Sequence, residues 1–219
     1  MKIFLDTANV ETIKKWVDTG LIDGVTTNPT LLAKEGSSPE NILRNICSIV
    51  QGPVSIEVTE KEPEKIYKQA CDIAKFSQNV VVKIPCVQEY LTVINRLVKN
   101  NIKLNITLIF STTQALIAEK LGVTYISPFL GRWDDIGSDG IEIIEEIVTL
   151  KSNYLNFTSE IIAASVRSVI HFKKIALAGA DIITVPSTVL EQAIKHPLTD
   201  KGIILFDNDW NKLGITKFF

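Results

Sequence analysis

Short apolar runs alternate along the chain with longer segments in which apolar residues recur every three or four positions. The apolar runs lie at 3–5, 24–28, 54–58, 80–85, 104–108, 123–126, 160–165 and 181–185. The segments with helical spacing lie at 9–18, 38–50, 62–76, 87–99, 111–121, 141–150 and 168–178. Near-continuous apolar runs are typical of strands covered on both faces, and the longer spacing is typical of amphipathic helices. The pattern therefore predicts an α/β fold.

The repeated strand–helix order predicts a (β/α)8 TIM barrel, although a compact one beside the ~250 residues typical of this fold. A doubly wound open sheet is the alternative. Eight evenly spaced units without a glycine-rich nucleotide loop favour the closed barrel. The polar segment 131–137, flanked by glycines, predicts a loop. Since no linker or shift in composition interrupts the chain, we expect residues 1–219 to form a single domain.

The C-terminal segment 199–219 stands outside the repeated units. Thr199 is suited to cap an additional C-terminal helix. The apolar stripe of this helix would consist of Ile203, Phe206, Trp210 and Leu213, and the sequence closes with Phe218 and Phe219. A barrel does not require a ninth helix, so we expect the stripe to pack on the barrel or on a neighbouring subunit.

Composition narrows the class of partner. The 219 residues are 46% hydrophobic and 22% charged with a formal net charge of −2, which gives no reason to expect nucleic acid or an anionic membrane surface as a partner. No stretch approaches the roughly 20 apolar residues that a membrane span needs, and the first apolar run is too short for a signal sequence. We expect a soluble, cytoplasmic protein.

The cysteines and histidines do not form a metal-ligand pattern. Cys47, Cys71 and Cys86 have neither metal-ligand spacing nor the even number of a disulfide framework, which is consistent with a reducing compartment. His171 and His196 are too isolated for a metal site or a histidine-based triad. We therefore expect neither a metal nor a cofactor.

One lysine interrupts the predicted strand at 80–85. Residues 79–85 read Asn-Val-Val-Val-Lys-Ile-Pro, and Pro85 lacks a backbone donor, so it suits the end of the strand and places Lys83 close to that end. A buried lysine readily shifts toward its neutral, nucleophilic form. The structural alternatives are a lysine whose stem reaches solvent and a lysine paired with a carboxylate. The ends of the other strands help to decide between these explanations.

Polar side chains stand at the ends of most of the other strands. In a barrel, alternate strand residues point inward, and the chemistry gathers at the C-terminal strand ends. Besides Lys83, those ends carry Asp6, Asn28, Glu57, Asn105, Thr107, Ser127, Phe129 and Ser165. Alternation puts the side chains of Glu57 and Ile56 on opposite faces of the sheet, and likewise those of Thr107 and Leu108. Each carboxylate alone also suits a helix cap or a counter-ion, but the set together predicts an active site.

A lysine with two carboxylates favours Schiff-base chemistry. A neutral lysine attacks a carbonyl, and the cationic nitrogen of the Schiff base accepts electrons when a neighbouring C–C bond breaks. One group must shuttle protons through carbinolamine formation and another must take the hydroxyl proton at the cleaved bond, and Glu57 and Asp6 supply these two. Arg132 and Arg167 offer planar forks suited to a phosphate, although arginines in loops are usually solvated.

Five motifs together resemble the transaldolase family. They are Leu5-Asp6-Thr7-Ala8, Gly24-Val25-Thr26-Thr27-Asn28-Pro29, Val82-Lys83-Ile84-Pro85, Ser127-Pro128-Phe129-Leu130-Gly131-Arg132 and Ala164-Ser165-Val166-Arg167. The match runs through most of the chain. Its short length and C-terminal helix resemble the small subfamily shared by microbial transaldolases and fructose-6-phosphate aldolases. The resemblance implies a (β/α)8 barrel with Lys83 as the Schiff-base lysine.

The resemblance also implies the reaction and the assembly. A dihydroxyacetone unit would pass from sedoheptulose 7-phosphate or fructose 6-phosphate to glyceraldehyde 3-phosphate or erythrose 4-phosphate. This reaction belongs to the non-oxidative pentose phosphate pathway. The protein would be a homo-oligomer, because pentameric rings, often paired into decamers, occur in this subfamily.

Residue roles follow from the same resemblance. Asp6 would handle the hydroxyl proton at the cleaved bond, and Glu57 would act through a water held by Thr107. The dihydroxyacetone hydroxyls would be bound by Asn28, Asn105 and Ser127. The phosphate would be bound by Arg132, Ser165 and Arg167.

Three positions distinguish the transaldolases of this subfamily from its aldolases. The transaldolase pattern has glutamate on strand three, asparagine on strand five and Ser-Pro-Phe on strand six, where the aldolases have glutamine, a nonpolar residue and Ala-Pro-Tyr. Glu57, Asn105 and the segment from Ser127 to Phe129 follow the transaldolase pattern. The alternatives are an aldolase that releases free dihydroxyacetone and a non-catalytic sugar-phosphate-binding barrel. The second should lack the lysine or a proton shuttle.

Overall fold

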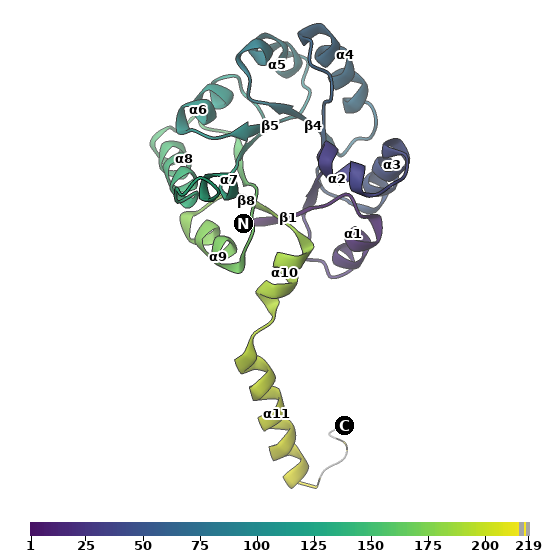
Figure 1. The fold of residues 1–219 in the computed structure, drawn as a ribbon, viewed down its shortest axis with the longest axis vertical. Coiled ribbons are helices and arrows are strands. Elements are labelled where there is room, and N and C mark those ends of the chain that lie inside the picture. Colours follow the sequence, from purple (N-terminus) through teal and green to yellow (C-terminus); the bar gives the residue numbers. More distant parts are fainter. Residues whose placement is uncertain (215–216, 218–219) are drawn as a thin grey trace.

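Eight parallel strands form a closed barrel in the computed structural model, which describes residues 1–214 and 217 (Figure 1). The strands are β1 (Lys2–Asp6), β2 (Gly24–Thr26), β3 (Val54–Glu57), β4 (Val80–Pro85), β5 (Leu104–Ile109), β6 (Tyr125–Pro128), β7 (Glu160–Ala163) and β8 (Ile182–Val185). The last strand closes on the first through register pairs such as Ile3 with Ile183. This closure confirms the predicted TIM barrel and excludes the open sheet.

A ring of helices surrounds the barrel (Figure 1). The helices are α1 (Val10–Val17), α2 (Pro29–Lys34), α3 (Pro39–Ile49), α4 (Pro63–Ala74), α5 (Leu91–Lys99) after the 3-10 turn η1 (Gln88–Tyr90), α6 (Thr112–Lys120), α7 (Gly131–Asp134), α8 (Ile141–Asn153), α9 (Val169–Ala178), α10 (Ser187–Ile194) and α11 (Pro197–Lys212). The segment 131–137, predicted as a loop, instead begins with α7. Hydrophobic spacing also did not predict α2, because its 6 residues span too few turns to show a period. It missed α10 as well, although this helix has the same 8 residues as α1 and buries Val189 and Leu190.

The barrel interior is filled in two layers. Alternation along the strands points Phe4, Val81, Tyr125, Ile162 and Ile182 inward, and these residues form a buried apolar cluster. The rings of Phe4 and Tyr125 meet edge to face, with centroids 6.3 Å apart. Two positions further along their strands stand the polar residues Asp6, Lys83, Ser127 and Thr184. The apolar layer therefore forms a dry floor beneath a polar upper layer.

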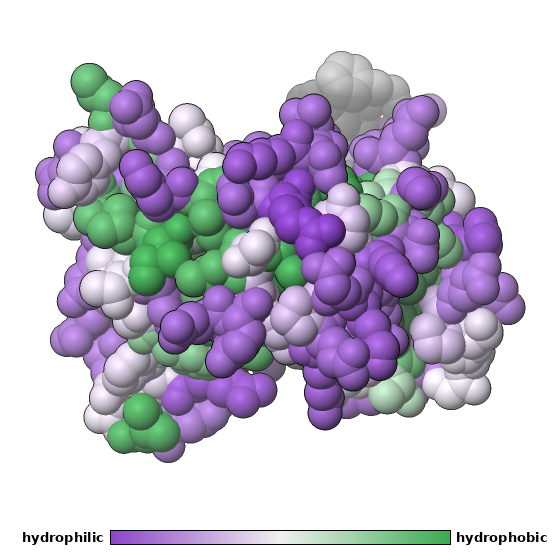
Figure 2. Space-filling model, turned by 90° about the horizontal axis from the view of Figure 1, so that it is seen from above, coloured by the Kyte–Doolittle hydropathy of each residue, from purple (hydrophilic) through white to green (hydrophobic). Residues whose placement is uncertain are grey.

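The outward face of the barrel packs against the helices. Val82 and Ile106 of the strands and Ile46 and Leu97 of the helices are at most 1% exposed and belong to one hydrophobic core. The flank of the molecule that carries α4 and α5 is mostly hydrophilic, with hydrophobic residues interspersed (Figure 2). This arrangement explains why the strands read as apolar runs and the helices as amphipathic segments.

Several predicted boundaries move in the structure. β6 begins at Tyr125 and extends through Pro128, and β7 ends at Ala163, so Ser165 lies in the loop that follows. The C-terminal helix begins at Pro197, and the ring of His196 accepts the capping hydrogen bond from the Leu198 N–H. Thr199 therefore lies inside α11 and does not cap it.

The predicted C-terminal helix is present as α11, which extends away from the barrel (Figure 1). None of its described residues is buried, and Ile203, Phe206 and Leu213 are 54%, 73% and 64% exposed. The barrel does not cover these three residues of the stripe, so packing on a neighbouring subunit stays the prediction. Phe218 and Phe219 lie outside the described residues. Within 1–214 and 217, no helix has the length and apolar character required to cross a membrane.

Candidate active site

A pocket of about 470 Å³ opens at the C-terminal ends of the strands. Ten of the eleven predicted site residues line it, namely Asp6, Asn28, Glu57, Lys83, Thr107, Ser127, Phe129, Arg132, Ser165 and Arg167. The eleventh, Asn105, lies directly behind the lining. Folding thus brings together residues from seven strands or from the segments that follow them.

Strand register places Lys83 between two polar neighbours. In the pairing of β3, β4 and β5, Lys83 is the register partner of both Glu57 and Asn105. Lys83 Nζ lies 3.0 Å from Glu57 Oε2, with the two side chains only 6% and 13% exposed. The amine also donates a hydrogen bond to the Thr27 carbonyl at 3.2 Å. The lysine does not reach solvent along its stem, and its amine is held beside a carboxylate within the pocket.

Asp6, at the end of β1, is the second carboxylate of the pocket. Its Oδ1 accepts a hydrogen bond from Thr26 Oγ1 at 2.8 Å, and Thr26 Oγ1 lies 2.5 Å from Thr184 Oγ1. Burial raises the pKa of the Asp6 carboxyl, although the charge of Lys83 and the hydrogen bond from Thr26 act in the opposite direction. A carboxyl with a raised pKa binds a proton more tightly, which suits general acid–base work.

An irregularity in β5 presents Thr107 to the pocket. The pairing with β6 shifts register between Ile106 and Ile109, and Leu108 has a φ of 56°, in the left-handed region. Strict alternation predicted that Leu108 faces away from Thr107, and this was wrong, because both residues line the pocket. Thr107 Oγ1 is buried and has no hydrogen-bond partner among the described residues. Such a hydroxyl is suited to hold a water or a substrate oxygen.

Asn105 supports the pocket from below. Its Nδ2 donates a hydrogen bond to Ser55 Oγ at 3.1 Å, and its Oδ1 accepts one from Ser127 Oγ at 2.6 Å. All three residues are at most 2% exposed. Asn105 therefore fixes the direction of the Ser127 hydroxyl, and a direct contact of Asn105 with a substrate stays a prediction.

Asn28 and Phe129 lie in the connections that follow β2 and β6, and both line the pocket. Asn28 caps α2, because its Oδ1 accepts a hydrogen bond from the Leu31 N–H at 2.9 Å. The amide nitrogen is therefore the group left to contact a ligand. Phe129 follows β6 and packs edge to face on Phe110, with ring centroids 5.9 Å apart. Its ring gives the pocket an apolar wall.

Two arginines and a strained serine line the pocket on the side of β6 and β7. Arg132 belongs to α7, whereas Ser165 and Arg167 follow β7. Ser165 has a φ of 62°, which is uncommon for a residue other than glycine. Arg167 binds both carboxylate oxygens of Asp135, with Nη2 and Oδ2 2.7 Å apart, and these hydrogen bonds hold the pKa of Asp135 below its usual range. This part of the pocket is suited to an anion.

Sequence reasoning missed three threonines that line the pocket, Thr26, Thr30 and Thr184. Thr184 is the one polar residue of β8, so the rule applied to the other strand ends would have found it. Thr26 precedes Asn28 by two positions and could have been found by alternation. The lining residues 29–31 come from α2, a helix that the hydrophobic pattern did not predict.

In the part of the chain that the structure describes, no group of three or more His, Cys, Asp or Glu residues is arranged to hold a metal ion. The pocket combines one amine, two carboxylates, several hydroxyls and two guanidinium groups. The amine can attack a carbonyl, the carboxylates can exchange protons, and the guanidinium groups can bind an anion. The arrangement suits carbonyl chemistry on a negatively charged substrate.

Both the sequence and the fold are similar to those of known proteins. Residues 3–216 match the sequence model of the transaldolase/fructose-6-phosphate aldolase family. Proteins named "probable transaldolase" from Caldicellulosiruptor saccharolyticus and Clostridium tetani are 54% and 52% identical, covering 97% and 98% of this chain and 98% and 100% of their own. Thiamine phosphate pyrophosphorylase from Pyrococcus furiosus has a TM-score of 0.55 at 16% identity, with 85% of each chain covered, which shows a shared fold alone.

Proposed function

Because the chain belongs to the transaldolase/fructose-6-phosphate aldolase family, we propose that it is a transaldolase whose Schiff-base nucleophile is Lys83. The enzyme transfers a dihydroxyacetone unit from a ketose phosphate, sedoheptulose 7-phosphate or fructose 6-phosphate. The acceptor is an aldose phosphate, glyceraldehyde 3-phosphate or erythrose 4-phosphate. This reaction belongs to the non-oxidative pentose phosphate pathway, and the three free cysteines fit a cytoplasmic enzyme.

The observation that carries the proposal is the buried amine of Lys83, 3.0 Å from the Glu57 carboxylate and at the wall of the pocket. A lysine that has lost its proton attacks the C2 carbonyl of the ketose. Glu57 exchanges protons with the carbinolamine, through a water held by the Thr107 hydroxyl. Loss of water then gives the Schiff base, whose cationic nitrogen acts as the electron sink.

Asp6 handles the second proton. It takes the proton of the C4 hydroxyl while the C3–C4 bond breaks, and the bonding electrons form an enamine attached to Lys83. The raised pKa of Asp6 supports this role, because a carboxylate that binds a proton tightly is the stronger base. When the acceptor aldehyde arrives, the enamine carbon attacks it, and Asp6 returns its proton to the new hydroxyl. Water then hydrolyses the Schiff base and frees Lys83.

Binding groups surround this chemistry. Asn28 and Ser127 contact the dihydroxyacetone hydroxyls, with Asn105 behind Ser127. Arg132, Ser165 and Arg167 bind the phosphate at the other end of the substrate. They line the same pocket as Lys83, as a substrate with a reactive carbonyl near one end and a phosphate at the other requires.

The second candidate function is an aldolase that protonates and hydrolyses the enamine without an acceptor. Phe129 favours transfer, because its apolar ring, packed on Phe110, offers no hydroxyl that orders water or delivers a proton to the enamine. Glu57 in place of glutamine favours transfer by the family pattern. A non-catalytic sugar-phosphate-binding barrel would have no use for the paired amine and carboxylate in its pocket.

We also infer that the protein forms a homo-oligomer, a pentamer or a decamer, through α11. This helix leaves the barrel with Ile203, Phe206 and Leu213 largely exposed. An apolar face of this kind is stabilised when another surface covers it. A second copy of the chain is the occupant that a projecting terminal helix fits, because each subunit offers one arm and receives another, which closes a ring.

Trapping of the Schiff base tests the proposed function. Borohydride reduction in the presence of fructose 6-phosphate should leave a three-carbon adduct on the peptide that contains Lys83, detected by mass spectrometry. The Lys83→Met variant is the control and should carry none. An adduct on a different lysine, or an unmodified but active enzyme, would contradict the assignment.

A further inference from the structure

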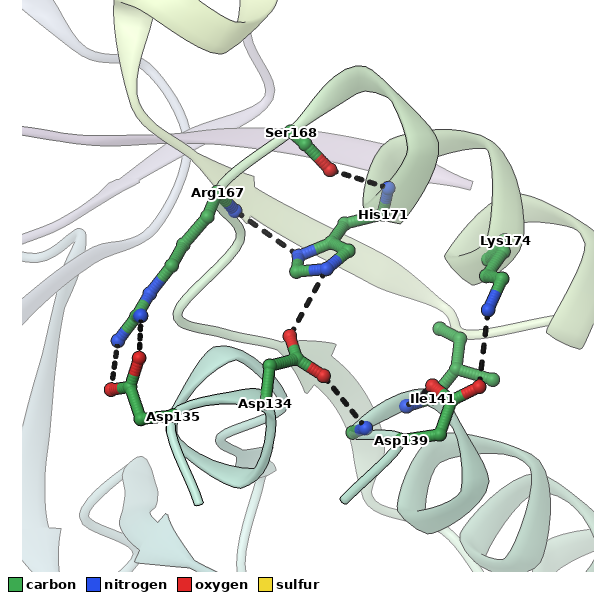
Figure 3. A network of polar contacts seen from close by, with 9 residues as sticks. Asp134, Asp135, Asp139, Ile141, Arg167, Ser168, His171 and Lys174 are labelled. Carbon is green, nitrogen blue, oxygen red and sulfur yellow. Dashed lines mark hydrogen bonds and ion pairs between the residues drawn. The ribbon is translucent and has the colours of Figure 1, made fainter. Parts of the chain in front are cut away.

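Two ion pairs and one contact between a carboxylate and an imidazole join the segment 134–139 to the segment 167–174 (Figure 3). They are Asp135 with Arg167, Asp134 with His171, and Asp139 with Lys174. The first segment follows β6 and the second follows β7. Of the side chains proposed to bind the substrate phosphate, Arg167 belongs to the second segment, and Arg132 and Ser165 each lie two residues before one of the segments.

His171 contacts both segments through its ring. Its Nδ1 accepts a hydrogen bond from the backbone N–H of Arg167 at 3.3 Å, and its Nε2 lies 3.1 Å from Asp134 Oδ2 (Figure 3). Asp134 Oδ1 accepts from the Gly140 N–H at 3.0 Å. Asp134 Oδ2 is buried and has no hydrogen bond among the described residues, so the imidazole Nε2 beside it is the polar group that it faces.

These contacts select one form of the imidazole. Because Nδ1 accepts the hydrogen bond from Arg167, it carries no proton, and the ring proton is therefore assigned to Nε2, toward Asp134. This tautomer links a carboxylate of α7, through the ring, to the backbone of Arg167. The two arginines of the pocket, Arg132 on α7 and Arg167 after β7, are thereby tied together behind the lining.

The junction between the segments tolerates little movement. A Cβ on Gly131 would lie 2.2 Å from the Ser165 carbonyl oxygen and 2.8 Å from Arg167 Nε, so only glycine permits this approach. Ser165 is held at a φ of 62°. A strained backbone of this kind persists where its surroundings determine it strongly. His171, whose ring receives the N–H two residues after Ser165, is part of those surroundings.

We propose that His171 and Asp134 form a positioning pair that holds the Arg132 and Arg167 segments in the geometry that binds a phosphate monoester. The proposal rests on the proposed function, in which these arginines bind the substrate phosphate. Neither residue of the pair lines the pocket, so each acts through the arginines and not on the substrate.

The contacts of His171 can also be explained locally, as part of the N-terminal cap of α9. Ser168 Oγ accepts the His171 N–H at 3.1 Å, and the His171 ring reaches back to the chain just before the cap, as in a capping box. A cap alone would affect the stability of α9 and would treat all substrates alike. A positioning pair affects phosphate binding selectively.

Kinetics with matched donors separate the two explanations. His171→Ala should raise the KM for fructose 6-phosphate and the inhibition constant of inorganic phosphate about fivefold, the effect expected for one lost hydrogen bond. The kcat and the KM for unphosphorylated fructose should stay within about twofold. His171→Gln keeps an acceptor for the Arg167 N–H and should restore most of the affinity. Lys174→Ala, which breaks the Asp139 pair on the same helix, is the control and should behave like the unmodified enzyme.

Each outcome bears on the proposal. It is overturned if His171→Ala leaves phosphate affinity unchanged or weakens both donors equally, or if His171→Gln loses as much phosphate affinity as His171→Ala. If His171→Ala does not fold, Asp134→Asn, which keeps an acceptor for the Gly140 N–H, should raise only the KM for fructose 6-phosphate, and equal effects on both donors overturn the proposal. Loss of phosphate preference in Arg132→Ala and Arg167→Ala, with none in His171→Ala, refutes the positioning pair and leaves the proposed function standing. Failure of the arginine variants themselves would refute the phosphate site.

Discussion

Removal of either charge from the buried Lys83–Glu57 pair should reveal a strong coupling between the two residues. The perturbations are Glu57→Gln, Lys83→Met and the double variant, which keep side-chain volume nearly constant. At 3.0 Å and an effective dielectric constant of about 20, Coulomb's law gives about 5 kcal/mol as an upper bound for the attraction. When Glu57 is neutralised, the Lys83 amine still interacts with the Thr27 carbonyl and the Asp6 carboxylate, and water can enter the open pocket. These interactions partly replace the lost attraction to Glu57.

We therefore expect a coupling free energy of roughly 2–3 kcal/mol, well above the ~0.2–1 kcal/mol typical of exposed pairs. The assay is urea unfolding of the four proteins at one fixed protein concentration, because oligomerisation would make stability depend on concentration. The coupling is the amount by which the double variant is less destabilised than the sum of the two single variants.

The exposed pair of Lys2 with Glu160 provides a matched control on the same barrel. Its atoms are 2.7 Å apart, closer than those of Lys83 and Glu57, but its side chains are 49% and 32% exposed. The cycle through Lys2→Met and Glu160→Gln should give less than about 1 kcal/mol. Equal coupling in the two cycles, or less than about 0.5 kcal/mol for the buried pair, would refute the argument that burial strengthens the contact.

Four further predictions follow from the site and the tail. Arg132→Ala and Arg167→Ala should each weaken phosphorylated donors by roughly 1.5–3 kcal/mol in kcat/KM and leave unphosphorylated donors nearly unaffected, and equal losses for both would show a structural role. Asp6→Asn should stabilise the fold increasingly as pH rises above the ordinary range of an aspartate. Burial raises the pKa of Asp6 in the folded state, so the folded protein loses stability when the carboxyl ionises, and the asparagine variant does not. A difference in unfolding free energy that is independent of pH would contradict this. Phe129→Tyr should raise the ratio of free dihydroxyacetone to transferred product at a fixed acceptor concentration, and an unchanged ratio in active enzyme would move the discrimination elsewhere. Deletion of the chain after Lys195 should shift the particle to smaller species in light scattering, and a full-length protein that is already monomeric would contradict the proposed assembly.

The polar positions at strand ends were readable from the sequence because a parallel barrel imposes a simple geometry. Glu57, Lys83 and Asn105 occupy neighbouring strands in direct register, and alternation alone decides that they face inward. Asn105 shows the limit of this reasoning. Alternation sets the side of the sheet but not the depth, and the hydrogen bond with Ser127 holds Asn105 behind the pocket wall.

Features that depend on tertiary contacts were beyond the sequence pattern. The left-handed backbone at Leu108 requires a register shift against β6, which no local preference of leucine would predict. α7 spans 4 residues, and its position depends on the close approach of Gly131 to Ser165. The pairing of Arg167 with Asp135 joins residues that are 32 positions apart on exposed segments, where sequence carries little information about partners.

The pocket is built from two kinds of segment, the barrel strands and the connections that follow them. The amine and both carboxylates stand on strands whose register is fixed by the whole barrel, whereas the groups proposed to bind phosphate stand on connections after β6 and β7. The groups proposed to make the bond and those proposed to select the substrate are therefore encoded in parts of the sequence that can diverge separately. For an engineer, this means that a library confined to 130–139 and 165–174 should explore donors with other charged groups, while the bond-forming machinery stays untouched.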